Sequence, residues 1–212
     1  MTVQLQKDKD FVSELLGRSD YAIIGEIVEP GAKVLDLGCG EGELLHWLAL
    51  KKSVDGRGVE ISGPKVQRAI ARGVSVFQCD MDEGLADYPD GTFDYVILSQ
   101  TLQETRKPRQ VLREMLRVGR RAIVAFPNFG HWRVRASMLR RGRAPRTKLF
   151  PYEWYDSPNI HFLTVDDFED LAAREGVVIE RRYFLSGPHK VTLLPNLFAE
   201  VAVYLVTSRA VQ

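Results

Sequence analysis

The sequence has few of the features that mark secreted, membrane-spanning or metal-binding proteins. Its 212 residues include only two cysteines, Cys39 and Cys79, and neither lies in a CxxC or Cys/His spacing, which argues against a disulfide framework and a zinc site. No apolar run reaches the roughly 18 residues needed to span a bilayer, and the opening MTVQLQKDKDF lacks the apolar core of a signal peptide. We therefore expect a cytoplasmic protein with two reduced thiols and no membrane partner.

Internal repeats, low-complexity tracts and a large net charge are also absent. The formal net charge is +1, and 45% hydrophobic with 27% charged residues is the composition of an ordinary globular domain, so we expect one domain over residues 1–212. Residues 131–148 are the local exception, with seven arginines and lysines and no acidic residue. No recognisable nucleic-acid-binding module accompanies this run. Docking to an acidic protein partner is therefore favoured, with a solvated helix and nucleic-acid binding as alternatives.

A regular alternation of strand and helix patterns runs through most of the chain. Apolar runs predict seven strands, at residues 33–37, 56–61, 74–79, 93–99, 122–126, 177–185 and 198–207. Helical spacing predicts helices at residues 43–52, 64–72, from Pro108 onward, and at 166–174 after Thr164 as N-cap. The fold class is therefore α/β, a mostly parallel seven-stranded sheet with helices on both faces, preceded by a helical extension at about residues 8–29.

Residues 127–163 interrupt this alternation. They contain several aromatics, several prolines and the basic run. A long irregular connection is uncommon unless it has a function, so we interpret this stretch as a substrate or partner segment.

The stretch 34-VLDLGCGEGELL-45 contains the most informative motif. Three glycines, at positions 38, 40 and 42, connect a strand to a helix, and such a turn lets a ligand approach the backbone at the carboxyl edge of a parallel sheet. The third glycine comes two residues after the second instead of three, which disfavours a dinucleotide. Asp36 would repel a pyrophosphate but suits a ligand with a sulfonium and an ammonium group, as in S-adenosylmethionine.

Acidic residues close two further predicted strands. Glu60 can accept both hydroxyls of a ribose, and Asp80 can accept from an adenine amine beside the soft apolar surface of Met81. Taken singly, an acid at a strand end is also explained as a solvated residue or a helix cap. Together the signals predict a cofactor site formed by Asp36, Gly38, Cys39, Gly40, Glu60, Ile61, Asp80, Met81, Ser99 and Gln100.

These motifs resemble those of class I S-adenosylmethionine-dependent methyltransferases over residues 34–124, where 93-FDYVILSQTLQE-104 is similar to the strand and loop that close over the methionine part of the cofactor. Nearly end to end, the chain resembles the MetW family of methionine-biosynthesis proteins, less closely beyond about Phe184 and before the first strand. The segments that carry this resemblance are VLDLGCGEGELL, GVEIS, ARGVSVFQCDMDEGL, REMLRVGRRAIVAFPNFGHWRVR and 149-LFPYEWYDSPNIHFLTVDDFEDL-171. The resemblance implies a Rossmann-like fold, S-adenosylmethionine or S-adenosylhomocysteine as ligand, and a bacterial protein acting with a homoserine O-acyltransferase.

The residues identify no catalytic group. No GxSxG elbow is present, so we do not expect this chain to transfer an acyl group itself. Gln100 and Glu104 are placed to face a transferable methyl group, and aromatics at 150–155 suggest a lid core or an interface. Candidate substrate or partner residues are Asn128, His131, Trp132, Tyr152, Trp154, Tyr155 and His161. Two hypotheses stay open, a regulatory or activating subunit of the acyltransferase and a small-molecule methyltransferase, with RNA methylation as a third.

Overall fold

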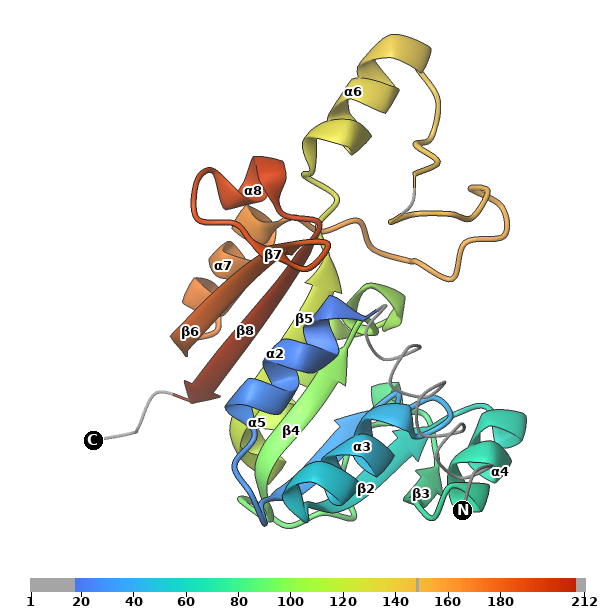
Figure 1. The fold of residues 1–212 in the computed structure, drawn as a ribbon, viewed down its shortest axis with the longest axis vertical. Helices are drawn as coiled ribbons and strands as arrows, with labels where there is room; N and C mark the ends of the chain where they lie inside the picture. The colour runs from blue at the N-terminus through green and yellow to red at the C-terminus, as the bar shows by residue number, and fades with distance from the viewer. Residues whose placement is uncertain (1–17, 148, 209–212) are drawn as a thin grey trace, which may run out of the picture.

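The computed structural model describes residues 18–147 and 149–208, which form one sheet flanked by helices (Figure 1). The strands are β1 (Lys33–Leu37), β2 (Asp55–Glu60), β3 (Ser75–Gln78), β4 (Phe93–Ser99), β5 (Gly119–Pro127), β6 (Val177–Ser186), β7 (His189–Lys190) and β8 (Val201–Ser208). The helices are α2 (Ser19–Ile27), α3 (Glu43–Lys52), α4 (Gly63–Ala71), α5 (Pro108–Val118), α6 (Trp132–Arg141), α7 (Val165–Arg174) and α8 (Pro195–Phe198), with short 3-10 turns η1 (Met81–Glu83) and η2 (Leu102–Glu104). The part of the predicted N-terminal helix before Arg18 lies outside the described residues.

The sheet order is β3-β2-β1-β4-β5-β8-β6-β7. Strands β1 to β5 are parallel to one another, and β8 runs antiparallel between β5 and β6. The mostly parallel α/β sheet is confirmed, but the strand count of seven is wrong by one. The eighth strand, β7, pairs only two residues with the end of β6, too few to show an alternating pattern in the sequence.

Both faces of the sheet are buried, as predicted. Side chains of α2 and α3 pack on one face, where Ile97 and Ile123 belong to the same apolar cluster. Side chains of α5 and α7 pack on the other face, in a cluster that contains Val96 and Val124. Successive residues of one strand thus point to opposite faces of the sheet, and both faces are covered by helices. For this reason the strands appear in the sequence as continuous apolar runs.

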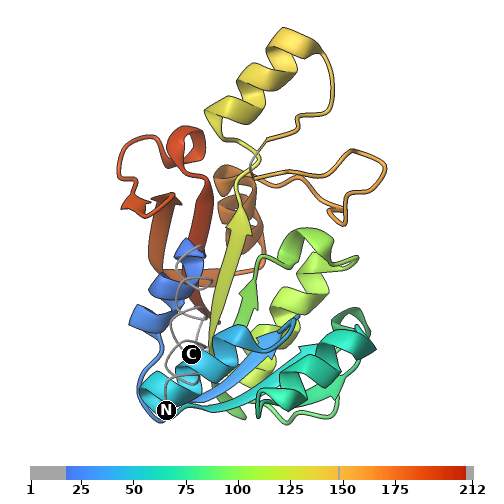
Figure 2. The ribbon, with the colours of Figure 1, turned by 45° about the vertical axis from the view of Figure 1, so that its right-hand side comes forward.

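The direction in which successive strands are added to the sheet reverses between β1 and β4. The chain runs from β1 outward to β2 and β3 and then returns to β4 on the other side of β1 (Figure 2). Ligands bind open α/β sheets in the crevice at the carboxyl ends of strands at such a switch point. The glycine motif follows β1 directly, so the fold places it at this crevice.

Two of the expected segments need correction. Residues 127–163 are not irregular throughout, because α6 occupies Trp132–Arg141 and projects beyond the carboxyl end of β5 (Figures 1 and 2). Only Val134 of this helix is buried, so it has almost no apolar stripe to reveal it in the sequence. Phe198 belongs to α8, and the last strand begins at Val201, three residues later than expected. The predicted N-cap Thr164 is confirmed, with a capping box that includes Asp167.

Candidate functional site

The turn after β1 is closed from two sides by neighbouring loops. Gly38 has a positive φ of 71°, and a Cβ there would lie 2.8 Å from the Thr101 side chain and 3.2 Å from the methyl group of Met81. The N–H groups of Gly38 and Cys39 donate to the Val59 carbonyl at 2.8 and 3.0 Å. Glycine is therefore required at position 38, and the turn brings the predicted residues Gly38 and Met81 together.

Cys39 takes part in the site through its backbone only. Its side chain is buried in the apolar cluster under α3, and a Cβ at Gly58 would lie 2.4 Å from its Sγ. Burial raises the pKa of the thiol far above its usual value. Both Cys39 and Cys79 are free thiols, as expected.

Asp36 is a buried carboxylate that the described residues leave without a hydrogen-bond donor. It lies near the end of β1 with an exposed fraction of 3%. Burial raises its pKa to about 8, against the attraction of Arg18 and with repulsion from Asp20, Glu43 and Glu60. A charged form that is poorly solvated and surrounded by like charges is stabilised by a nearby cation. The position therefore suits a positively charged ligand group.

Glu60 is fixed at the end of β2 by the backbone around it. Its two carboxylate oxygens accept from Gly40 N–H at 3.0 Å and from Ser62 N–H at 2.8 Å. Each oxygen keeps a second lone pair, so the carboxylate can still accept hydroxyl groups. Ile61 follows with 63% of its surface exposed, an apolar side chain beside the carboxylate. This pairing of a rigid acceptor and an apolar wall suits a ribose with its base.

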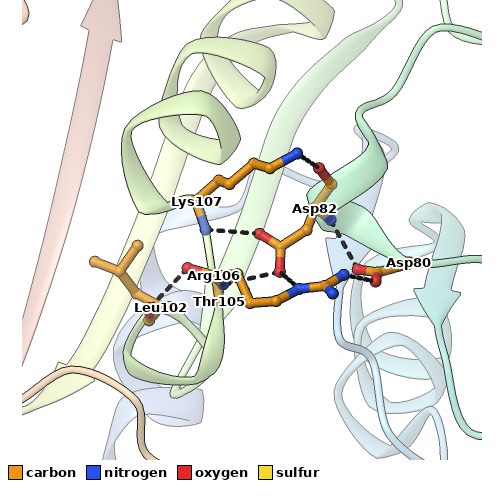
Figure 3. Close-up of polar contacts among 6 residues, drawn as sticks. All are labelled: Asp80, Asp82, Leu102, Thr105, Arg106 and Lys107. Carbon is orange, nitrogen blue, oxygen red and sulfur yellow. Dashed lines mark hydrogen bonds and ion pairs between the residues drawn. The ribbon is translucent and has the colours of Figure 1, made fainter.

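Asp80 and Asp82 connect η1 to the loop before α5 (Figure 3). Asp80 accepts from Asp82 N–H at 2.9 Å and forms an ion pair with Arg106. Asp82 is buried and accepts the N–H groups of Arg106 and Lys107 at 2.8 and 2.9 Å. Burial opposes ionisation of Asp82, but these hydrogen bonds outweigh it and lower its pKa. Asp80 thus caps η1, which agrees with the alternative explanation of an acid at a strand end as a helix cap. It also pairs with Arg106, a residue that the sequence did not point to.

The end of β4 carries Ser99 and Gln100. The Ser99 hydroxyl donates to Asp20 at 2.6 Å and accepts from Arg18 at 3.0 Å. Gln100 has a left-handed φ of 54°, and its N–H donates to the Ala125 carbonyl at 2.7 Å. Sequence analysis missed Arg18 and Asp20 as well, since a charged pair at the start of a helix is common and points to no ligand.

Glu104, predicted to face a methyl group, lies in η2 within electrostatic reach of Glu60. Partial desolvation raises its pKa, Lys65 opposes this rise, and Glu60 adds to it. A carboxyl group with a raised pKa is a suitable general base, and Glu104 shares this property with Asp36.

Asn128 and His131 support the base of α6. The Asn128 side chain donates to the carbonyls of Asn196 and Ala199 at 3.0 and 2.8 Å and accepts from Gly130 N–H. His131 is the N-cap of α6, and burial lowers its pKa. Both side chains are buried, so the structure gives them supporting contacts instead of an open pocket face.

The remaining predicted aromatics are exposed. Trp132, Tyr152, Trp154 and Tyr155 have exposed fractions of 45%, 51%, 76% and 66%. Phe150, in contrast, is buried and packs edge-on against Phe129 at 5.2 Å. A cavity of about 420 Å³ opens among Arg143, Arg146, Phe150, Tyr152, Trp154 and Phe162. The two expectations for residues 150–155, a lid core and an interface, stay predictions: Phe150 is buried and the other aromatics named here are exposed.

The described ranges contain no cluster of three or more histidine, cysteine, aspartate or glutamate side chains suited to a metal ion. Among the same residues, no helix is both long and apolar enough to cross a membrane.

Sequence comparison gives two agreeing results. The family model for methionine biosynthesis protein MetW matches residues 18–206. The bifunctional methionine biosynthesis protein MetXA/MetW of Rhodopirellula baltica is 36% identical over 204 residues, which cover 90% of this chain and 33% of that protein. The chain therefore spans about a third of the length of this relative.

Comparison with solved structures shows the fold. A SAM-dependent methyltransferase from Thermotoga maritima superposes with a TM-score of 0.64 and 18% identity, covering 97% of this chain and 96% of the other. The [4+2]-cyclase SpnF superposes with a TM-score of 0.64 and 17% identity over 89% and 80% of the two chains. The architecture is that of class I methyltransferases, and its presence in a cyclase shows that the fold alone does not specify the reaction.

Proposed function

Since this chain belongs to the MetW family of methionine biosynthesis proteins, we propose that it binds S-adenosylmethionine or S-adenosylhomocysteine and thereby regulates or activates a homoserine O-acyltransferase. The observation that carries the ligand assignment is the buried, under-coordinated carboxylate of Asp36 beside a glycine turn. A sulfonium and an ammonium group supply the positive charge that this carboxylate lacks.

The other residues around the crevice fit the remaining parts of the same ligand. Glu60 is oriented by Gly40 and Ser62 to accept ribose hydroxyls. Asp80 is an acceptor for the adenine amine, and Met81 and Ile61 offer apolar surface to the ring. The ligand would supply chemistry through its activated methyl group, whereas the residues on this chain bind and orient it.

The acyltransferase partner is supported by the fused relative and by the segment that contains α6. In the Rhodopirellula protein, MetXA and MetW are parts of one chain, so the two units occur in equal number and within reach of each other. In the present chain, Arg140, Arg141 and Arg143 are exposed and form no ion pair among the described residues. We propose that residues 127–163, defined here as the basic arm, dock on an acidic face of the acyltransferase.

One loop connects the ligand site to the basic arm. The main-chain carbonyl of Gln103, in η2, accepts from the N–H groups of Ile160 and His161 at 2.8 and 3.0 Å. Three residues later in the same loop, Arg106 pairs with Asp80. A nucleoside that competes for Asp80 would disturb Arg106, and the Gln103 contacts would transmit this change to the arm. The proposed regulation therefore has a physical route.

The second candidate function is methyl transfer to a small molecule, and Glu104 favours it. Its raised pKa and its electrostatic interaction with Glu60 support a role for Glu104 as general base in this reaction. The regulatory function and methyl transfer use the same ligand. Methyl transfer converts it to S-adenosylhomocysteine, whereas regulatory binding leaves it unchanged.

The decisive experiment mixes this chain with a homoserine O-acyltransferase from the same genome. Co-purification is tested first, and acyl transfer is then measured with and without this chain over a series of S-adenosylmethionine concentrations. A change in acyltransferase rate that depends on this ligand supports the regulatory function. Absence of a complex together with an unchanged rate contradicts it, and stoichiometric formation of S-adenosylhomocysteine would favour the second candidate.

A further inference from the structure

We propose that the cavity inside the basic arm binds a carboxylate-bearing side chain of the acyltransferase together with an apolar residue beside it. This inference rests on the proposed complex with that enzyme and adds the point of contact and its chemistry. The cavity has a volume of about 420 Å³, and its lining comes from residues 143–162 of the arm.

The apolar wall of the cavity is held by packing within the arm. Phe150 is buried, and its ring centre lies 5.2 Å from that of Phe129. Phe162 also lines the cavity, and its ring centre lies 4.7 Å from that of Phe129. The N–H of Phe129 donates to the Leu163 carbonyl at 3.0 Å, which joins the two ends of the arm. Because these contacts lie within one chain, the wall is formed before a partner binds, and less ordering opposes association.

Two guanidinium groups line the same cavity and differ in how far they are paired. Arg146 donates to the Pro151 carbonyl through Nε at 3.2 Å and pairs with Glu153 through Nη1 at 2.7 Å. Arg143 is exposed and forms no ion pair within the described part of the chain. The lining residues thus carry two positive charges and one negative charge. The excess positive charge is complementary to a carboxylate.

The exposed part of the lining contains the residue types that dominate the binding energy of protein interfaces. Trp154 and Tyr152 line the cavity, and more than half of the surface of each is exposed. Tryptophan, tyrosine and arginine are enriched among interface hot spots, and the aromatic pair combines a large apolar area with a polar group. A partner side chain in this cavity would contact aromatic surface and guanidinium groups together.

Two other occupants have related chemistry. A small carboxylate such as phenylacetate would meet the same groups, and a second copy of this chain offers the exposed acids Asp166 and Asp170 on α7. The acyltransferase is favoured because the exposed aromatics lie on the same segment as the unpaired arginines. In addition, MetXA and MetW share one chain in the Rhodopirellula relative.

Alanine substitution tests the cavity in the complex of the full chain with the acyltransferase from the same genome. Trp154→Ala should weaken this complex by on the order of thirtyfold, the effect of a hot spot. Leu139→Ala is the matched control, because Leu139 is 89% exposed on α6 of the same arm and precedes the lining residues. The control should weaken the complex by less than about fivefold. Surface plasmon resonance measures both affinities, and thermal unfolding shows that the variants are folded.

Replacement of the acid in the lining should have the opposite effect. Glu153→Gln keeps a hydrogen-bond acceptor for Arg146 but removes the charge that competes with the partner's carboxylate. The complex should therefore tighten by about two- to fivefold at low salt, and the gain should decrease as salt screens it. A cavity with a purely structural role predicts no such gain, so an unchanged or weaker complex would count against a bound carboxylate.

The outcomes separate this inference from the proposed function. If wild type forms the complex and Trp154→Ala binds no more weakly than Leu139→Ala, the inference is overturned and the proposed function stands. Self-association of wild type in sedimentation that Trp154→Ala removes would assign the cavity to a second copy. Binding of phenylacetate that leaves the complex intact would assign it to a small molecule. Absence of any complex with wild type contradicts the proposed function itself.

Discussion

Asp36 is an acidic residue whose charged form the described structure stabilises poorly. Its carboxylate is buried, receives no hydrogen bond from the described residues, and has a pKa raised from 3.8 to about 8. At neutral pH the folded protein therefore keeps a proton that the unfolded chain releases. Because the folded state binds more protons between these two pKa values, this group makes the ligand-free protein less stable as pH rises from about 4 to about 8.

Binding of a cationic ligand at Asp36 should release this proton. The ligand stabilises the ionised form and lowers the pKa of Asp36, so affinity for S-adenosylmethionine should rise as pH increases from about 6 to about 8. Calorimetry in buffers of different ionisation enthalpy measures the protons released. Asp36→Asn should abolish the release and weaken binding. An affinity of the wild type that is independent of pH over this range would contradict the assignment.

Glu60 accepts hydrogen bonds within the fold, in addition to its proposed role in ligand binding. Its carboxylate accepts two backbone N–H groups, whereas an amide has only one acceptor oxygen and opposes the second donor with its own N–H₂. Glu60→Gln should therefore lower the free energy of unfolding by about 1 to 3 kcal/mol. Urea denaturation followed by circular dichroism measures this change. Glu83→Gln, at an exposed acid in η1, is the control and should have little effect. Equal stabilities of the two variants would show that the Glu60 contacts are not needed.

The proposed regulation depends on the contact between η1 and the loop before α5 (Figure 3). Asp82 holds the loop through the backbone N–H groups of Arg106 and Lys107, so this part of the contact does not depend on any one long side chain. The Arg106 side chain is 63% exposed and is the part that a ligand at Asp80 would meet. Exposed ion pairs contribute little free energy, so this part of the contact can exchange readily.

Arg106→Ala should strengthen nucleoside binding and weaken its effect on the acyltransferase. Removing the guanidinium frees Asp80, and the affinity for S-adenosylmethionine should rise by a factor of about two to five. The same change should reduce the dependence of acyltransferase rate on the ligand. Arg109→Ala removes an arginine that pairs with Glu175, the residue just after α7, and should leave both quantities unchanged. Weaker nucleoside binding by the Arg106 variant would show that this guanidinium contacts the ligand favourably.

The sequence predicted the elements that have a strong local signal. Strands β1 and β4 and helix α3 have the bounds expected, because apolar runs and glycine turns define them over a few residues. Helix α6 buries a single side chain and β7 contains two residues, so neither leaves a periodic pattern. The same division holds in the site. Asp36 and Gly38 belong to one local motif and Glu60 ends the next predicted strand, whereas Arg18 and Arg106 contact Ser99 and Asp80, 81 and 26 positions away, without any sequence pattern that marks them.

At the scale of the whole molecule, charge is distributed unevenly. The chain has a net charge of +1, yet residues 131–148 carry seven basic residues and no acidic one. Two of these, Arg133 and Arg146, pair with Glu200 and Glu153. Arg140 and Arg141 lie in the last turn of α6, which extends away from the sheet (Figure 2). Such a projecting charge attracts an acidic surface before contact and becomes less effective as salt screens it.

The last prediction concerns this projecting charge. Replacing Arg140, Arg141 and Arg143 together by glutamine should weaken the complex with the acyltransferase by at least an order of magnitude at low salt, because charge steers association and arginines are frequent hot spots. Affinity for S-adenosylmethionine should not change, since all three side chains are exposed outside the crevice. Surface plasmon resonance at several ionic strengths measures the first quantity and calorimetry the second.

A matched control separates docking from general charge. Replacing Lys51, Arg174 and Arg181 by glutamine removes the same number of positive charges from exposed positions on the body. If the arm is the docking surface, this control keeps wild-type affinity and salt dependence, and only the arm variant loses them. Equal weakening in both variants would mean that the acyltransferase responds to the net charge of the molecule, and the arm would then have no specific part in docking.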